Sequence, residues 1–278
     1  MAGIKEVAEE AGVSTATVSR ALRGLHHVNQ QTREKIIAAA EKLKFQYDQM
    51  PGQIAEGMSV QAILEAAVQS ASDQLIKAIR KAHPTHNIDI VGKGMDEART
   101  PDAEVMWRVR LIDSTANFLA GYPAFMVTVA FYRHGKMEHI ALVNPFTGGE
   151  FTATRGRGMQ FLEKRTRTSN QKKLQKALVS TYKPDFNTPF FAVLKEQQCD
   201  VRLTGSFLTD LTACCGGQTV AFVANQVDEL DIEVASLLAQ ESGALTGDAN
   251  GRPLSLKSKT LVVANPKLFK LVIQALSA

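Results

Sequence analysis

Cysteine is scarce in this sequence. The 278 residues contain three cysteines, at positions 199, 214 and 215, and none of them belongs to a C-x-x-C pair. Disulfide scaffolds use many paired cysteines, and zinc or redox motifs use C-x-x-C spacing. Adjacent cysteines without such partners suit reduced, buried thiols that behave as small apolar side chains. We therefore expect a protein of a reducing compartment, the cytoplasm.

Long hydrophobic runs are also missing. The longest clean run, around Phe125 to Phe131, has the length of a strand, whereas a membrane-spanning helix needs about 20 apolar residues. Charged residues at positions 5, 6, 9 and 10 interrupt the pattern of a signal peptide. No internal repeat is visible. These absences predict a cytoplasmic protein without a membrane partner.

The composition is that of an ordinary globular protein. Hydrophobic residues make up 45% and charged residues 22% of the chain, and the net charge is +4. This charge permits an anionic partner but does not require one. The length allows a small module attached to a larger domain.

Residues 4–45 show the pattern of three short helices: IKEVAEEAG, STATVSRALRG and NQQTREKIIAAAEKLKF. Gly12 and Gly24 are expected to end the first two, while Ser14 and Asn29 are expected to cap the second and third. Two short helices joined by a tight turn place the second in the major groove of DNA. The pattern predicts an all-α helix-turn-helix, although a three-helix cap that only packs would look similar.

Positive charge is concentrated in the middle of this segment. Residues 1–48 contain seven lysines and arginines against six acids, but residues 11–33 contain Arg20, Arg23 and Arg33 and no acid. The second helix therefore carries its charge where phosphates would be met.

The same letters resemble the DNA-binding domain of the LacI-type repressor family over residues 3–48. The resemblance implies that Thr15, Ala16 and Arg20 face base edges, and arginine is the commonest specific reader of guanine. It assigns phosphate positioning or capping to Ser14, Thr17, Ser19, Asn29 and Thr32.

Residues 49–60 are polar, contain proline and glycine, and are expected to form a hinge or linker. QIAEGM resembles the hinge of the same repressor family, which extends that resemblance to residues 3–58. In that family the hinge forms a helix on DNA and inserts a side chain into the minor groove, a role that would fall to Met58. Gly52 and Gly57 weaken such a helix. We expect a DNA-binding domain at 1–48, a hinge at 49–60 and a larger domain at 61–278.

LacI-type repressors normally continue into a sugar-binding domain, and this chain does not. From about residue 62 to 278 it resembles the inositol monophosphatase family, in particular its bacterial SuhB branch. The segments that carry the resemblance are WRVRLIDSTANFLAGYPAFMVTVAF, GEFTATRGRGMQF, RLTGSFLTDL and LDIEVASLLAQESGALTGDANG. It implies a large α/β domain of layered helices and sheets, and a chemistry in which magnesium ions hydrolyse phosphate monoesters.

The metal ligands that the resemblance implies are mostly missing. The family's signature Asp-Pro-Ile/Leu-Asp-Gly-Thr corresponds to residues 110–115, so Asp113 and Thr115 are retained while the first aspartate is Arg110. A later metal-binding aspartate is retained as Asp231. The family's paired glutamates fall near positions 93 and 94, which are lysine and glycine, and an upstream acid falls near Val68.

Magnesium needs several oxygen ligands in near-octahedral geometry, and arginine at the position of the ion repels it. We therefore expect no catalytic residue and no metal, with Asp113, Thr115 and Asp231 as remnants. Arg110 is expected to pair with Asp113 or Asp231. The other hypothesis is that Arg110, Ser114 and Thr115 bind a phosphate.

The leading interpretation is a DNA-binding transcriptional regulator whose degenerate phosphatase-like domain supplies dimerisation and senses a small phosphorylated ligand. Its partners would be an operator in double-stranded DNA and a second copy of the chain, with no cofactor. The alternative is a magnesium-dependent, SuhB-like phosphomonoesterase with a DNA-binding appendage, which needs substitute acids such as Asp89, Asp96 or Glu97. A fusion without a joint function is a third reading.

Two further features have plain explanations. Residues 155–176 contain eight lysines and arginines and one acid, which is typical of a solvated surface, although such a run also suits nucleic-acid contacts. His83 and His86 lack partners at metal-binding spacing, so we expect a surface turn there.

Overall fold

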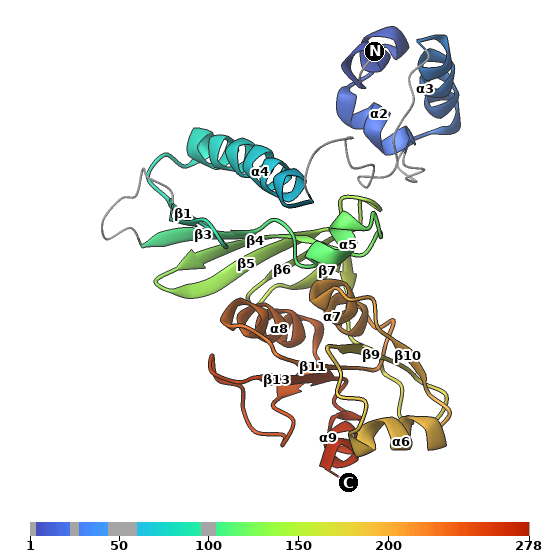
Figure 1. The fold of residues 1–278 in the computed structure, drawn as a ribbon, viewed down its shortest axis with the longest axis vertical. Coiled ribbons are helices and arrows are strands. Elements are labelled where there is room, and N and C mark those ends of the chain that lie inside the picture. Colours follow the sequence, from blue (N-terminus) through green and yellow to red (C-terminus); the bar gives the residue numbers. More distant parts are fainter. Residues whose placement is uncertain (1–3, 23–27, 44–59, 96–103, 278) are drawn as a thin grey trace.

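The computed structural model describes residues 4–22, 28–43, 60–95 and 104–277. Its first three helices are α1 (Ile4–Ala11), α2 (Thr15–Leu22) and α3 (Gln30–Lys42), at the positions expected from the sequence. They share a small core that includes Val7, Val18 and Ile36, all fully buried (Figure 1). Two capping expectations are confirmed: the Asn29 side chain accepts from the Thr32 amide at 2.8 Å and the Ser14 hydroxyl from the Thr17 amide at 3.1 Å.

The helix α4 (Val60–Ala82) covers the first sheet near its β1 edge (Figure 1). It packs Val68, Leu75 and Ile79 against Ile88 and Val109 of the sheet. Within the described residues no helix has the length and apolar character needed to cross a membrane.

The first sheet has eight strands in the order β2-β1-β3-β4-β5-β6-β7-β8. The β1–β3 pair is parallel and the other neighbours are antiparallel. The strands are β1 (Asn87–Ile90), β2 (Gly94–Met95), β3 (Val105–Arg110), β4 (Val127–Arg133), β5 (Lys136–Val143), β6 (Glu150–Thr154), β7 (Gly158–Phe161) and β8 (Lys164–Thr166). The short helix α5 (Thr115–Leu119) follows β3.

The second sheet has five strands in the order β10-β9-β11-β13-β12. Its first three strands are parallel, whereas β13 is antiparallel to both its neighbours. The strands are β9 (Leu178–Tyr182), β10 (Asp200–Arg202), β11 (Ala221–Asn225), β12 (Leu245–Gly247) and β13 (Thr260–Ala264).

Four helices complete the layers: α6 (Pro189–Glu196), α7 (Phe207–Cys215), α8 (Glu229–Ser242) and α9 (Phe269–Ser277). Helices α7 and α8 lie between the two sheets, while α6 and α9 cover the outer face of the second sheet (Figure 1). The expectation of a large α/β domain of layered helices and sheets is confirmed.

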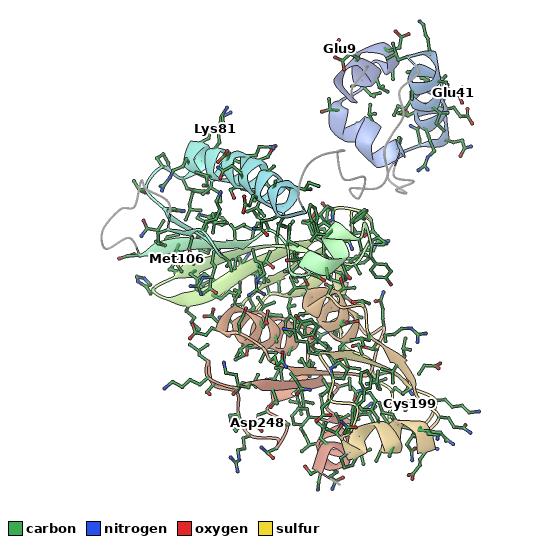
Figure 2. All side chains as sticks on the ribbon, in the orientation of Figure 1. Glu9, Glu41, Lys81, Met106, Cys199 and Asp248 are labelled. Carbon is green, nitrogen blue, oxygen red and sulfur yellow. The ribbon has the colours of Figure 1, made fainter. Side chains whose placement is uncertain are left out.

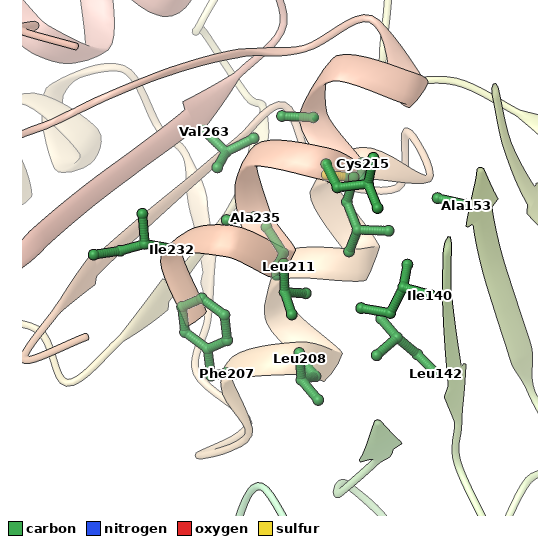
Figure 3. Packing of buried hydrophobic residues seen from close by; sticks show 14 of the residues in the cluster. Ile140, Leu142, Ala153, Phe207, Leu208, Leu211, Cys215, Ile232, Ala235 and Val263 are labelled. Atoms are coloured by element: carbon green, nitrogen blue, oxygen red, sulfur yellow. The ribbon is translucent and has the colours of Figure 1, made fainter. Parts of the chain in front are cut away.

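The main core lies in the central layer, where both sheets contribute apolar side chains to α7 and α8. Figure 3 shows Leu211 and Cys215 of α7 facing Ile140 and Leu142 of the first sheet. Cys214 and Cys215 are completely buried, and burial raises the pKa of the Cys215 thiol to about 12. These thiols therefore pack as small apolar groups, as expected.

Candidate functional site

A pocket of about 780 Å³ collects residues from several distant segments. The main ones are α4, the turn after β1, the end of β3 and the start of α8, and the ends of β9 and β11 and the start of α7 add Tyr182, Lys183, Gln226 and Phe207. The pocket is lined by most of the positions that the family resemblance marks, namely Val68, Lys93, Arg110, Asp113, Thr115 and Asp231. This pocket is therefore the candidate functional site.

Arg110 lies at the end of β3 and reaches two carboxylates at the start of α8. One terminal nitrogen is 2.5 Å from Asp231 Oδ1, and the other is 2.5 Å from Asp228 Oδ2. Burial lowers the pKa of Arg110, but the attraction and hydrogen bonds of Asp231 and Asp228 outweigh it and raise the pKa. The guanidinium is therefore a fixed positive charge that two acids balance. Of the two partners expected for Arg110, Asp231 is the one with which it pairs, whereas Asp113 bonds other groups, and Asp228 is a partner that the sequence did not reveal.

The remaining oxygens of these two acids serve the backbone of α8. Asp228 Oδ1 accepts from the Asp231 amide at 2.9 Å, and Asp231 Oδ2 accepts from the Asp228 amide at 3.2 Å. This reciprocal capping box satisfies amides at the helix start, where acids are also favoured by the helix dipole. Each carboxylate thus gives one oxygen to the helix and the other to Arg110.

The two acids differ in exposure, and their pKa values move in opposite directions. Asp231 is 8% exposed, and burial raises its pKa against the opposing pull of Arg110. Asp228 is 60% exposed; burial raises its pKa, but the hydrogen bond and charge of Arg110 together with backbone hydrogen bonds outweigh burial, and its pKa is lowered.

Asp113 has neutral partners. Its Oδ1 accepts from the Met126 amide at 2.7 Å, while its Oδ2 accepts from the Ser206 hydroxyl at 2.6 Å and the Leu208 amide at 3.0 Å. Burial raises its pKa, and these hydrogen bonds oppose the rise. The carboxylate therefore ties the segment after β3 to the entry of β4 and to the start of α7.

A second buried acid, Asp210 on α7, lies close enough to Asp113 for the two charges to interact. Its Oδ2 accepts from the Thr204 amide at 3.1 Å and from the Thr204 hydroxyl at 3.0 Å. Burial raises the pKa of Asp210 to about 7, with a further contribution from the charge of Asp113. No motif in the sequence marked this residue, because its pKa depends on tertiary burial.

The family implies magnesium, and the donor set does not fit it. Across the described residues no group of three or more His, Cys, Asp and Glu side chains is arranged to hold a metal. Asp89, one of the substitute acids, bonds Arg108 at 2.8 Å, while Asp96 and Glu97 lie outside the described residues. Magnesium needs several free oxygen ligands, and those of Asp228, Asp231 and Asp113 are already engaged.

The hypothetical phosphate site at Arg110, Ser114 and Thr115 is only partly assembled. Arg110 and Thr115 line the pocket, but both terminal nitrogens of Arg110 are bound to carboxylates. Ser114 is buried at the start of α5, whose five residues form little more than one turn. A phosphate here would have to compete with two carboxylates for the same guanidinium.

The residues assigned to DNA lie on α2 and at the start of α3. Ser14 and Thr15 are exposed at the beginning of α2, with Thr17 in its first turn, and Asn29 and Thr32 begin α3. The backbone of α2 includes positions 16, 19 and 20, but the side chains of Ala16, Ser19 and Arg20 lie outside the described part of the structure, as does all of Met58.

Known proteins resemble this chain over most of its length. The model of the inositol monophosphatase family matches residues 25–278. The Nus factor SuhB of Pseudomonas aeruginosa is 33% identical over 214 residues, which cover 74% of this chain and 79% of that protein. The crystal structure of the extragenic suppressor protein SuhB from Bartonella henselae has a TM-score of 0.70 at 24% identity, covering 78% of this chain and 90% of that one. The inositol monophosphatase of Anabaena has a TM-score of 0.66 at 23% identity, covering 78% and 89%.

These matches support the large domain and its SuhB-like character, which was the alternative interpretation of the whole chain. The family match begins at residue 25, ahead of the boundary expected at 61. The DNA-binding interpretation of residues 3–58 rests on the sequence resemblance alone. The chain belongs to the inositol monophosphatase family.

Proposed function

We propose that this chain is a SuhB-like protein that acts in transcription as a binding protein. We also propose that the pocket lined by Arg110, Asp113 and Asp231, called the family pocket below, performs no metal-dependent hydrolysis. The observation that carries the proposal is Arg110, which forms ion pairs with Asp228 and Asp231 where the family resemblance implies a metal ligand. The name Nus factor, borne by the Pseudomonas aeruginosa relative, supports a role in transcription.

The energetics oppose a hidden magnesium site. A metal would have to displace Arg110 from Asp231, and removing one partner of a buried ion pair costs about 3–5 kcal/mol. The displaced guanidinium would remain close to the divalent cation, so that like charges would repel each other. Lys93, which also lines the pocket, adds a second positive charge.

The test is an assay of the purified full chain on inositol monophosphate with magnesium. We expect no turnover and no saturable Mg²⁺ binding by calorimetry. Arg110→Asp alone should not restore activity, because the position of the paired glutamates is still occupied by Lys93 and Gly94. Turnover that requires magnesium and is lost in Asp231→Asn would refute the proposal and establish the phosphatase interpretation, which family membership favours.

We further propose that α1–α3 bind double-stranded DNA. Helix α2 carries no acidic residue, whereas α1 and α3 carry acids such as Glu9 and Glu41, which Figure 2 shows at the surface of this part. The exposed Thr15 and the capping residues at the starts of α2 and α3 are the groups that a helix-turn-helix directs at bases and phosphates. Palindromic operators need paired readers, so the large domain would act as a homodimer.

Arg20→Ala should cost about 1–3 kcal/mol of discrimination at one base pair if its contact with guanine is bidentate. Binding across a library of operator variants measures this, with Lys81→Ala on α4 as a matched removal of one positive charge. An unchanged preference at every position would remove Arg20 from base recognition.

A further inference from the structure

A second pocket, of about 610 Å³, lies on the outer side of the second sheet. Its walls come from β9, α6, β11, β13 and α9, and include Thr181, Phe190, Phe191, Val223, Val262 and Leu276. The volume falls within the range of small-molecule sites, which are mostly apolar with a few placed polar groups. None of these six residues lines the pocket around Arg110, whereas Lys183 and Gln226 stand between the two pockets and line both.

The topology places this pocket where open α/β sheets bind ligands. Strands β9 and β11 are parallel neighbours, and the chain leaves β9 for α6 on the outer face but leaves β11 for α8 on the inner face. Adjacent parallel strands whose connections diverge leave a crevice outside their carboxyl ends, and ligands occupy that crevice. Thr181 and Val223 stand near those ends, and both line the pocket.

Thr181 carries the polar observation. It is 1% exposed, and its hydroxyl has no hydrogen-bond partner among the residues that the structure describes. The neighbouring Ser180, on the opposite face of β9, bonds the Asp210 carbonyl at 3.0 Å. Buried polar groups are almost always paired because an unpaired one is costly. A rotation about Cα–Cβ of Thr181 would present its hydroxyl to an acceptor in the pocket.

The rim adds a positive charge. Lys183 follows β9 and lines the pocket, with its ammonium 5.1 Å from the centre of the Tyr182 ring. The side-chain amide of Asn225 donates to the Lys183 carbonyl at 3.1 Å, which holds this part of the rim in place. Asp185, also on the rim, accepts from the Asn187 amide at 3.0 Å. A donor and a cation on one side favour an acceptor that carries negative charge, and the Asp185 carboxylate on the same rim reduces this preference.

The opposite wall is aromatic. The rings of Phe190 and Phe191 are 5.6 Å apart at 72°, and Phe186 packs on Phe191 at 5.0 Å. Such walls favour a flat ring against them. We propose that this pocket binds a small aromatic carboxylate, with its ring against Phe190 and Phe191 and its carboxylate at Thr181 and Lys183. This proposal does not depend on the function proposed above.

The test is calorimetric titration of the full chain with 2-naphthoate, compared with the neutral isostere 2-naphthamide. We expect saturable binding of the carboxylate that weakens about tenfold in Thr181→Val and at least as much in Lys183→Gln. The carboxylate should lose its advantage over the amide in Lys183→Gln. Thr152→Val, the same exchange on the first sheet, and Lys195→Gln should bind as the parent does.

Thermal unfolding without ligand separates lost binding from lost folding. Thr181→Val removes an unpaired buried hydroxyl, so it should unfold at the same temperature as the parent or above it. Absence of saturable binding by the parent would overturn the proposal. Equal affinity of the parent, Thr181→Val and Lys183→Gln for 2-naphthoate would overturn it too. Loss of 2-naphthoate binding in Arg110→Met would also overturn it, because binding would then belong to the pocket around Arg110.

Discussion

Two acids that the family resemblance marks, Asp113 and Asp231, line one pocket but are held by different kinds of partner. The partners of Asp113 are two amides and a hydroxyl, all neutral. Asp231 shares its oxygens between Arg110 and the start of α8. One carboxylate organises the backbone, and the other balances a buried charge. The comparison teaches that an acid retained from a metal site is explained by its present partners and does not by itself indicate catalysis.

The largest expected effect on stability comes from removing Arg110 from its ion pairs with Asp228 and Asp231. Arg110→Met should lower the free energy of unfolding at neutral pH by about 3–5 kcal/mol, because Asp231 would remain buried without its cation. Urea unfolding measures the loss. Asp228→Asn is the control: Asp228 is 60% exposed and asparagine also caps helices, so about 1 kcal/mol or less is expected. Equal costs for the two variants would show that the pair with Asp231 contributes no more than a surface pair.

Substitution of Asp113, whose partners are neutral, should lower the free energy of unfolding somewhat less. Asp113→Asn replaces one acceptor oxygen with an amide group that faces a donor, so about 2–3 kcal/mol is expected. A double-mutant cycle sharpens the comparison. Arg110→Met and Asp231→Asn should be strongly non-additive, whereas Arg110→Met and Asp113→Asn should couple weakly. Similar coupling energies in both cycles would mean that Arg110 interacts with Asp113 as strongly as with Asp231.

The smallest expected effect is the pH dependence that Asp210, close to Asp113, adds to the stability. The pKa of Asp210 is about 7 in the folded chain and about 4 when unfolded, so the folded chain holds the extra proton between these values. Its contribution to stability is therefore present below about pH 4 and is lost as the pH rises through about 7. Asp210→Asn should flatten this part of the stability profile relative to the parent. A profile of unchanged slope would contradict the raised pKa.

Local signals in the sequence were sufficient for the local structure. Asn29 before α3 and Gly12 after α1 predicted helix ends that are present. The family resemblance predicted that Arg110 would pair with Asp113 or Asp231, because an arginine among implied metal ligands needs a counter-ion, and the structure shows the pair with Asp231. Asp228 was missed although D-x-x-D at the start of a helix is the spacing of a capping box.

Long-range contacts were beyond the reach of these signals. His83 and His86 lie in the surface turn after α4, as expected, but the contacts of His86 were not predicted: it stacks on His83 at 4.5 Å and accepts from the Trp107 indole at 3.0 Å. That contact depends on β3 lying beside β1, which no local pattern shows. The buried Asp210 and the pocket at Thr181 depend in the same way on the order of strands in the second sheet.

The ion pairs of Arg110 also make the present arrangement difficult to change one residue at a time. Reverting this one residue to aspartate would place three carboxylates at positions 110, 228 and 231 around a space with no cation to hold them. Restoring a metal would require further acids at the same time, near Val68 and Lys93. Each single step toward the ancestral site is therefore less stable than the present arrangement. A metal site of the kind that the family resemblance implies therefore cannot be built here one residue at a time without a loss of stability.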